Sequence, residues 1–487
     1  MPVAAGPQAQ EPDTFRLPAV HVEVLVVSGT PAGTAAALAA ARRGRHTLLV
    51  EERPFLGGDM TGVGVNTFDM NYGPKKQRGE QQNLTRGIFL EFLQKLGVHF
   101  DVEQAKRLFL EKVASQPRLT LWLNTDVVRA IVRDGTLLGV ITQNKITGAR
   151  AKVIANQIVD ATDDADVAAL TGVPYRFGRE ESGLDRLTQP ATLIFRMGGV
   201  DWGELTQYLQ SERKQGRIAG AWMGYAWGYS SIMHLYVPTS QRLAVYDMNL
   251  GRQRDGTVLI NSLQIFGVDG TSEASANEAT ALARAEMPRL INFLRQNATG
   301  FARAYLVETM PYLYVRETRH IEGMYRLTAE DIIEEKVFWD RIAVASYPID
   351  LHPYTPDFRN YYGSRRYVYT IPFRSLVPVR VDNLLVASRS ISATYEAAGS
   401  VRVVPTTFSL GEAAGIAASV SVELGIPPRH LARSGVLVQR LQGILQEQGA
   451  YLGEPRLPTA SVPTAPGSGA LSQARTRPAT TSSPGGR

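Results

Sequence analysis

The sequence predicts an α/β fold in which a three-layer, Rossmann-like domain is discontinuous along the chain and holds an inserted α+β domain. Two stretches predict it. An apolar strand at residues 24–27 enters a turn of small residues, and a small-residue helix follows at 34–41. Far along the chain, residues 381–389 indicate a strand with a small-residue turn, and 405–418 indicate a helix. A strand and helix that return to the first sheet after an insertion account for both stretches.

The first turn has a dinucleotide-binding pattern. Its residues are Ser28, Gly29, Thr30, Pro31, Ala32 and Gly33. Gly33 matches the last glycine of G-x-G-x-x-G, whereas Ser28 and Thr30 replace the first two. The helix that begins here points its free N–H groups at a pyrophosphate, and Glu51, roughly 20 residues later, is spaced to accept ribose hydroxyls. We interpret the pattern as an adenine dinucleotide site; the alternative is an ordinary α/β protein that binds no nucleotide.

The segments between these landmarks have clear periodicities. Apolar residues at helical spacing predict helices at 83–96 and 102–115. Strands are predicted at 119–124, 127–133, 137–144 and 151–160, as a three-stranded meander followed by a last parallel strand. In the inserted part, a long helix is expected at 272–296 with a cap at 271–273, and Gly411 and Gly415 share one face of the later helix.

These features divide the chain as follows. We expect a flexible arm at 1–21, the first part of the nucleotide-binding domain at 22–173 and a substrate domain at 174–345. The return to the first domain covers 346–430, a C-terminal helix covers 431–454, and residues 455–487, rich in Pro, Ser, Thr, Gly and Ala, form a disordered tail.

Five segments in the same order resemble the large FAD-dependent oxidoreductase family that includes xanthan-lyase-like proteins. They are the GTPAG turn at 29–33 and residues 160–170, 315–323, 371–378 and 391–405. The resemblance spans about residues 22–425 and implies a noncovalent FAD held by a Rossmann-like domain. The family usually has a glycine where this chain has Asp163 and Ser388, often a histidine at the position of Tyr395, and commonly a cysteine after the arginine turn; this chain contains no cysteine.

The pattern and the resemblance together give the expected site. The turn from Ser28 to Gly33 would hold the pyrophosphate and Glu51 the ribose, with Glu52 and Arg53 behind it pointing to solvent. The further residues expected at the cofactor are Gly57, Gly58, Val127, Asp164, Arg389 and Gly411. The candidate catalytic residues are Arg316, His320, Arg374, Tyr395 and Arg402. For each arginine the alternative is a structural ion pair with Glu317, Glu322 or Glu396, and guanidinium groups also suit an anionic substrate beside a flavin.

Composition excludes several function classes. The net charge of +6 is spread without long runs of one sign, so we expect no nucleic-acid partner. The scattered histidines and the absence of cysteine predict no metal site and no disulfide. No apolar run reaches membrane-spanning length and no signal peptide is recognised, so the expected location is the cytoplasm, with secretion as the alternative if the start is misassigned.

The expected function is hydride transfer between FAD and a small organic substrate, with anionic compounds among the candidates and a nicotinamide or another acceptor as the redox partner. Two alternatives stay open. One is a flavoprotein without net redox chemistry, of isomerase or lyase type. The other is a degenerate nucleotide-binding protein without catalysis. The sequence does not define the substrate or the oligomeric state.

Overall fold

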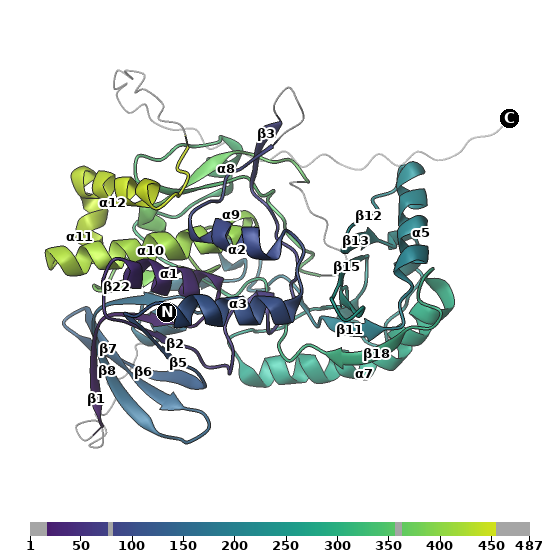
Figure 1. Ribbon diagram of the computed structural model, residues 1–487, viewed down its shortest axis with the longest axis horizontal. Helices are drawn as coiled ribbons and strands as arrows, with labels where there is room; N and C mark the ends of the chain where they lie inside the picture. Colours follow the sequence, from purple (N-terminus) through teal and green to yellow (C-terminus); the bar gives the residue numbers. More distant parts are fainter. Residues whose placement is uncertain (1–16, 76–80, 356–362, 454–487) are drawn as a thin grey trace. The chain divides into compact units, whose positions relative to one another are not determined.

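The computed structural model describes residues 17–75, 81–355 and 363–453 (Figure 1). The predicted tail at 455–487 and most of the predicted arm at 1–21 lie outside the described residues. None of the helices in the described part is by itself both long and apolar enough to cross a membrane; α9 (Tyr395–Val401) and α10 (Val404–Leu424) meet these criteria only together, as a pair bent by 92°.

The nucleotide-binding domain is built on a mostly parallel sheet. Its parallel strands lie in the order β5 (Leu119–Trp122), β2 (Thr47–Val50), β1 (Ala19–Val27), β8 (Arg150–Asp160) and β22 (Leu384–Val386). Strands β6 (Thr125–Arg133) and β7 (Thr136–Asn144) extend β8 as an antiparallel meander. The predicted strands are confirmed, but placing 119–124 in the meander was wrong, because β5 pairs in parallel with the free edge of β2.

Two helices cross at very short distance over this sheet. α1 (Pro31–Arg42) and α10 lie side by side, and almost every residue in each is buried (Figure 1). A Cβ on Gly411 would overlap the carbonyl oxygen of Ala32, and a Cβ on Gly415 would overlap that of Ala36. The glycine pair therefore permits backbone contact between the two helices. The spacing of the glycines predicted close packing against a strand or the cofactor, whereas the partner is the helix α1.

The inserted domain has its own core. Its sheet has the order β12 (Gly220–Trp222), β13 (Tyr225–Gly228), β15 (Met248–Arg252), β16 (Val258–Asn261), β11 (Phe195–Gly198) and β18 (Tyr305–Thr309). The helices α5 (Trp202–Lys214) and α7 (Glu273–Asn297) accompany it, and Ser272 caps α7 as predicted. A small sheet, β10 (Ala191–Thr192), β17 (Gln264–Ile265) and β14 (Leu243–Ala244), lies in the same core. Its buried residues extend from Ala191 to Leu313, whereas Leu327–Ala345, expected here, contributes to the core of the first domain.

The remaining elements are short or lie in the returning segment. The helix expected at 83–96 begins only at Ile88, because Gly87 before it has φ = 63°. The expected C-terminal helix at 431–454 is replaced by two helices, α11 (Pro428–Arg433) and α12 (Gly435–Glu447). These elements are β3 (Tyr72–Lys75), β4 (Gln81–Asn83), α2 (Ile88–Leu96), α3 (Val102–Ala114), α4 (Asp166–Leu170), β9 (Tyr175–Phe177), α6 (Ser230–Met233), β19 (Arg319–Ile321), α8 (Ala329–Ile333), β20 (Arg341–Ala345), β21 (Tyr369–Pro372), α11 (Pro428–Arg433) and α12 (Gly435–Glu447).

Candidate functional site

The turn between β1 and α1 replaces two motif glycines without losing its shape. Ser28 adopts the left-handed conformation that favours glycine, with φ = 77°. Thr30 caps α1: its hydroxyl accepts a hydrogen bond from the Gly33 N–H at 3.1 Å and donates one to the Ala161 carbonyl at 2.9 Å. A Cβ on Gly33 would overlap the Ser28 carbonyl oxygen, so this glycine is required. The first turn of α1 keeps a free donor, because the N–H of Ala32 has no acceptor among the described residues.

Glu51 fixes this turn from the end of β2. Its carboxylate accepts hydrogen bonds from the Gly29 N–H at 2.6 Å, the Ser28 hydroxyl at 3.1 Å and the Arg53 N–H at 2.9 Å. Burial raises the pKa of Glu51, while nearby Arg53 opposes the shift. Gly57, with φ = 101°, donates its N–H to the Gly29 carbonyl at 2.7 Å, and Gly58 follows it against Thr30. The two glycines therefore bring the next loop against the turn.

A cavity of about 770 Å³ lies at the carboxyl ends of the parallel strands. Four residues expected at the cofactor line it, although they are far apart in the sequence: Ser28, Val127, Asp164 and Arg389. The other expected residues, Gly29 to Gly33, Glu51, Gly57, Gly58 and Gly411, belong to the packed structure behind it. This is the edge at which open α/β sheets bind their ligands.

Charged side chains of both signs line this cavity. Arg389 donates to the Asp164 carboxylate at 2.7 Å and lies 3.7 Å from Asp163. These two carboxylates and Asp59 raise the pKa of Arg389 against its burial. The expectation that Arg53 points to solvent was wrong: this guanidinium lies 4.6 Å from the ring centre of Tyr312 and, like Glu52, lines the cavity.

The donors in this cavity fit a bound FAD. The Nε atoms of Arg53 and Arg389 are buried and have no hydrogen-bond partner among the described residues. Guanidinium groups and the N–H groups at the start of a helix are suited to a diphosphate. Arg53 and Arg389, which line the cavity, would thus hold the pyrophosphate, with Val127 at the adenosine end; the Ala32 N–H and the Glu51 carboxylate lie behind this lining and would support the turn.

A second group of ionisable residues lies around Tyr314. Arg402 donates to the Tyr314 hydroxyl at 2.9 Å and to the Asp350 carboxylate at 2.9 Å. The Arg316 guanidinium lies 4.5 Å from the ring centre of Tyr314 and donates to Pro190 and Thr192 at 2.7 and 2.8 Å. Arg316 forms no ion pair within the described ranges, and its Nε has no partner. Burial lowers the pKa of Arg316 to about 10, so it is still a cation at neutral pH.

The other three candidate catalytic residues lie in different surroundings. His320 contacts Glu317 at 3.2 Å, and Glu317 also accepts from the Gln189 N–H at 2.9 Å, in a buried network. Arg374 is held by both oxygens of Asp340, at 2.8 and 3.1 Å. Tyr395 begins α9, and its N–H donates to Glu181 at 2.5 Å. Thus Arg316 and Arg402 are brought together, whereas His320, Arg374 and Tyr395 do not join them.

Several site residues were missed from the sequence. Asp59 follows Gly57 and Gly58 directly, so its place in the glycine-rich loop was a usable signal. Arg53 follows Glu51 by two residues, so its place just beyond the end of the same strand could also have indicated a site residue. Tyr314 and Asp350 have no local motif, because only the fold brings them to Arg402.

Asp59 predicts a pH dependence of stability. Burial, and then repulsion by Asp163, raises the pKa of Asp59 to about 7. Between about pH 4 and pH 7 the folded state therefore holds a proton that the unfolded state has released, so the free energy of unfolding falls as pH rises and levels off above pH 7. The contribution is at most about 1.4 kcal/mol per pH unit. Asp59→Asn should remove it and raise the melting temperature of the apoprotein at pH 8 relative to the parent.

The comparison is made as a difference between the two proteins, because burial raises the pKa of Asp160 to about 7 as well. Melting temperatures are measured from pH 5 to pH 8.5 by circular dichroism. Parallel curves for the parent and Asp59→Asn would contradict the assignment.

Comparison with known proteins identifies the family of this chain. A family model described as FAD dependent oxidoreductase matches residues 23–445. No curated protein matches the sequence. Among solved structures, a geranylgeranyl bacteriochlorophyll reductase-like protein from Thermoplasma acidophilum shows 13% identity and a TM-score of 0.44, over 88% of this chain and 84% of that chain. The p-nitrophenol 4-monooxygenase of Pseudomonas putida shows 10% identity and a TM-score of 0.41, over 90% and 91%. On the family match, which covers most of its length, this chain belongs to the FAD-dependent oxidoreductases.

Proposed function

We propose that the protein binds FAD noncovalently in the large cavity and transfers hydride between it and a small organic substrate held beside Arg316. The observation that carries the proposal is that Arg316 is a buried cation without an ion pair. The residue is 4% exposed, and no carboxylate among the described residues pairs with it. A buried cation without a counterion is costly, so such a site favours a negative group on a ligand. Membership among the xanthan-lyase-like proteins remains a prediction from the resemblance.

The arginines have different roles in this proposal. Arg53 and Arg389 hold the diphosphate, with the start of α1 behind them. When bound, FAD would accept or donate the hydride. Arg316 binds a carboxylate or stabilises an enolate oxygen of the substrate. Arg402 differs, because Asp350 already balances its charge at 2.9 Å. Arg402 therefore orients Tyr314, to which it donates a hydrogen bond, and Tyr314 supports the guanidinium of Arg316.

The absorbance spectrum of the purified protein tests the proposal. We expect flavin bands, release of FAD on denaturation without covalent attachment, and bleaching of the bands by a substrate from a panel of small organic acids and alcohols under anaerobic conditions. Protein that stays colourless after incubation with FAD would overturn cofactor binding. Turnover of a substrate with no change of flavin redox state would favour the isomerase or lyase alternative.

Glu51 gives a sharper test of cofactor binding. Glu51→Gln keeps one oxygen to accept the Gly29 N–H but loses the second acceptor, which binds the Arg53 N–H, together with the charge that we expect at the ribose. A hydrogen bond to a charged group contributes about 1.5–3 kcal/mol, so FAD affinity should fall about ten- to a hundredfold. Affinity is measured by fluorescence titration of the apoprotein with FAD. Glu103→Gln, on the exposed face of α3, is the matched control; equal affinities in both variants would remove Glu51 from the site.

A further inference from the structure

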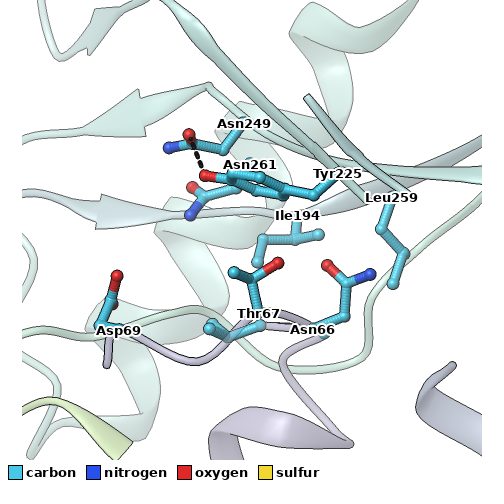
Figure 2. A pocket seen from close by; sticks show the side chains of 10 residues that line it. Asn66, Thr67, Asp69, Ile194, Tyr225, Asn249, Leu259 and Asn261 are labelled. Carbon is cyan, nitrogen blue, oxygen red and sulfur yellow. Dashed lines mark hydrogen bonds between the residues drawn. The ribbon is translucent and has the colours of Figure 1, made fainter. Parts of the chain in front are cut away.

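A second, smaller cavity lies between a loop of the nucleotide-binding domain and the sheet of the inserted domain. It has a volume of about 70 Å³ and is bounded on one side by residues 64–69, in the loop that continues from Gly58. Strands of the inserted sheet bound the other side (Figure 2). Figure 2 shows Asp69 and Thr67 directed from the loop toward Tyr225, Asn249 and Asn261 of the sheet. A cavity of this size has room for a small functional group but not for a whole ring, since a cavity of about 150 Å³ is one that binds benzene.

The lining is rich in hydrogen-bonding groups, and part of it is unused. Tyr225 donates its hydroxyl proton to the Asn249 side-chain oxygen at 2.7 Å, which leaves the Asn249 amide N–H₂ free to donate. Asn261 makes no side-chain hydrogen bond within the described residues. Asn249 is exposed, so the cavity is open to solvent on this side. Two amides and a carboxylate directed into a small cavity can together bind a hydroxyl group, which both donates and accepts.

Asp69 is the one carboxylate on this lining in the described part of the chain. Burial, with repulsion from Asp350, raises the pKa of Asp69 to about 6, while Arg402, a hydrogen bond from Tyr347, and Arg366 oppose the shift. The group is thus ionised at neutral pH and still basic enough to take a proton.

The loop also joins this cavity to the cofactor region. Asn71, two residues beyond Asp69, donates to the Thr406 hydroxyl at 2.9 Å in the first turn of α10. Its side-chain oxygen accepts from the N–H groups of Ser346 and Tyr347, at 2.8 and 3.0 Å. One continuous segment, residues 57–71, therefore lines the large cavity through Asp59 and the small one through Asp69. We expect this helix start, the first turn of α10, to lie beside the flavin ring, where its N–H groups would face the negative edge of the ring.

We propose that the small cavity receives a hydroxyl group of the substrate and that Asp69 accepts its proton during oxidation. The inference rests on the proposed hydride transfer. An alcohol gives its hydroxyl proton to the Asp69 carboxylate and its carbon-bound hydrogen, with two electrons, to oxidised FAD. The products are a carbonyl compound, a protonated Asp69 and two-electron-reduced FAD, so atoms and electrons balance.

Four three-carbon probes separate the hydroxyl from the charge of the ligand. Lactate and propionate differ at C2 by a hydroxyl, and so do propane-1,2-diol and propan-1-ol. Binding to the FAD-loaded protein is measured from the difference spectrum of the flavin. We expect the C2-hydroxyl member of each pair to bind about tenfold tighter or more, and Asn261→Leu to remove that preference. Equal binding within both pairs, or no binding of any probe, would overturn the inference.

Asp69→Asn tests proton acceptance apart from binding. We expect retained FAD and retained probe binding, with flavin reduction by the best hydroxyl substrate slowed a hundredfold or more. In the parent, the rate of flavin reduction should rise with pH through about 6. This rise should be absent from the pH profile of Asp69→Asn. Groups that face Asp69 and set this titration are Tyr347, Asp350, Arg366 and Arg402.

Asp255→Asn, in the turn between β15 and β16, is the matched control and should behave like the parent. An unchanged pH profile in Asp69→Asn would overturn the role of this carboxylate. Failure of the proposed function has a different signature: protein without FAD, or flavin that no substrate bleaches, would count against hydride transfer itself. If Arg316 binds an anion, lactate should bind more tightly than propane-1,2-diol. Equal binding of these two probes, with both hydroxyl preferences intact, would count only against Arg316 as an anion site.

Discussion

Replacing Gly411 by alanine is expected to destabilise the folded protein by about 3 kcal/mol and to release the cofactor. The added methyl group would overlap the carbonyl oxygen of Ala32, a backbone atom that cannot rotate away. Overpacking of a tight core costs about 1–3 kcal/mol, and a clash with backbone lies at the upper end. Because Ala32 belongs to the first turn of α1, displacement of α1 would also misplace the N–H group expected at the pyrophosphate.

Gly443→Ala is the matched control. Gly443 lies within α12, and no atom outside its own helix lies within 4 Å of the position of an added Cβ. The same substitution should there stabilise the protein by about 0.5–1 kcal/mol, because alanine favours the helix more than glycine does. Chemical denaturation and FAD occupancy are measured for both variants. A Gly411→Ala protein as stable as Gly443→Ala would show that α1 and α10 separate without penalty.

Gly411 also illustrates what the sequence predicts well. Its spacing from Gly415 is a local property of the helix, and the turn from Ser28 to Gly33 and the strands at either end are likewise short-range patterns. These features identified the parallel sheet and the close-packed face of α10, and they picked out Glu51, which holds the turn. They did so even where the motif was altered, because Ser28 keeps the left-handed backbone of the glycine that it replaces.

Local sequence patterns could not predict which carboxylates pair with the arginines. Arg374 and Asp340 are 34 residues apart, and Arg402 and Asp350 are 52 apart. Nothing in either local sequence marks the pairing, since both are set by how the returning segment packs on the first domain. The partners expected from the sequence were Glu317, Glu322 or Glu396. Among the described residues, the ion pairs of Arg374 and Arg402 are with Asp340 and Asp350 instead.

The two arginines beside Tyr314 are therefore expected to respond differently to substitution. Arg316→Lys keeps a cation but loses the planar fork that binds a carboxylate or enolate with two N–H groups. The loss of one donor to an oxyanion corresponds to about 2.7–4 kcal/mol, so turnover should fall a hundred- to a thousandfold. Folding and FAD content should survive, because the contacts of Arg316 to Pro190 and Thr192 are to neutral groups that a lysine can reach.

Arg402→Lys should leave more turnover than Arg316→Lys, since Asp350 balances the charge at this position and the ligand does not need it. Its truncation, Arg402→Ala, should instead cost stability, because it removes a buried guanidinium that binds both the Tyr314 hydroxyl and the partly exposed Asp350 carboxylate. The measurements are turnover, melting temperature and flavin occupancy of all three variants at one pH. Normal turnover in Arg316→Lys would end its proposed role as an anion site, and His320 and Tyr395 would then be the next residues to substitute. Equal losses in Arg316→Lys and Arg402→Lys would mean that the two guanidinium groups act as one unit through Tyr314, because that ring contacts both.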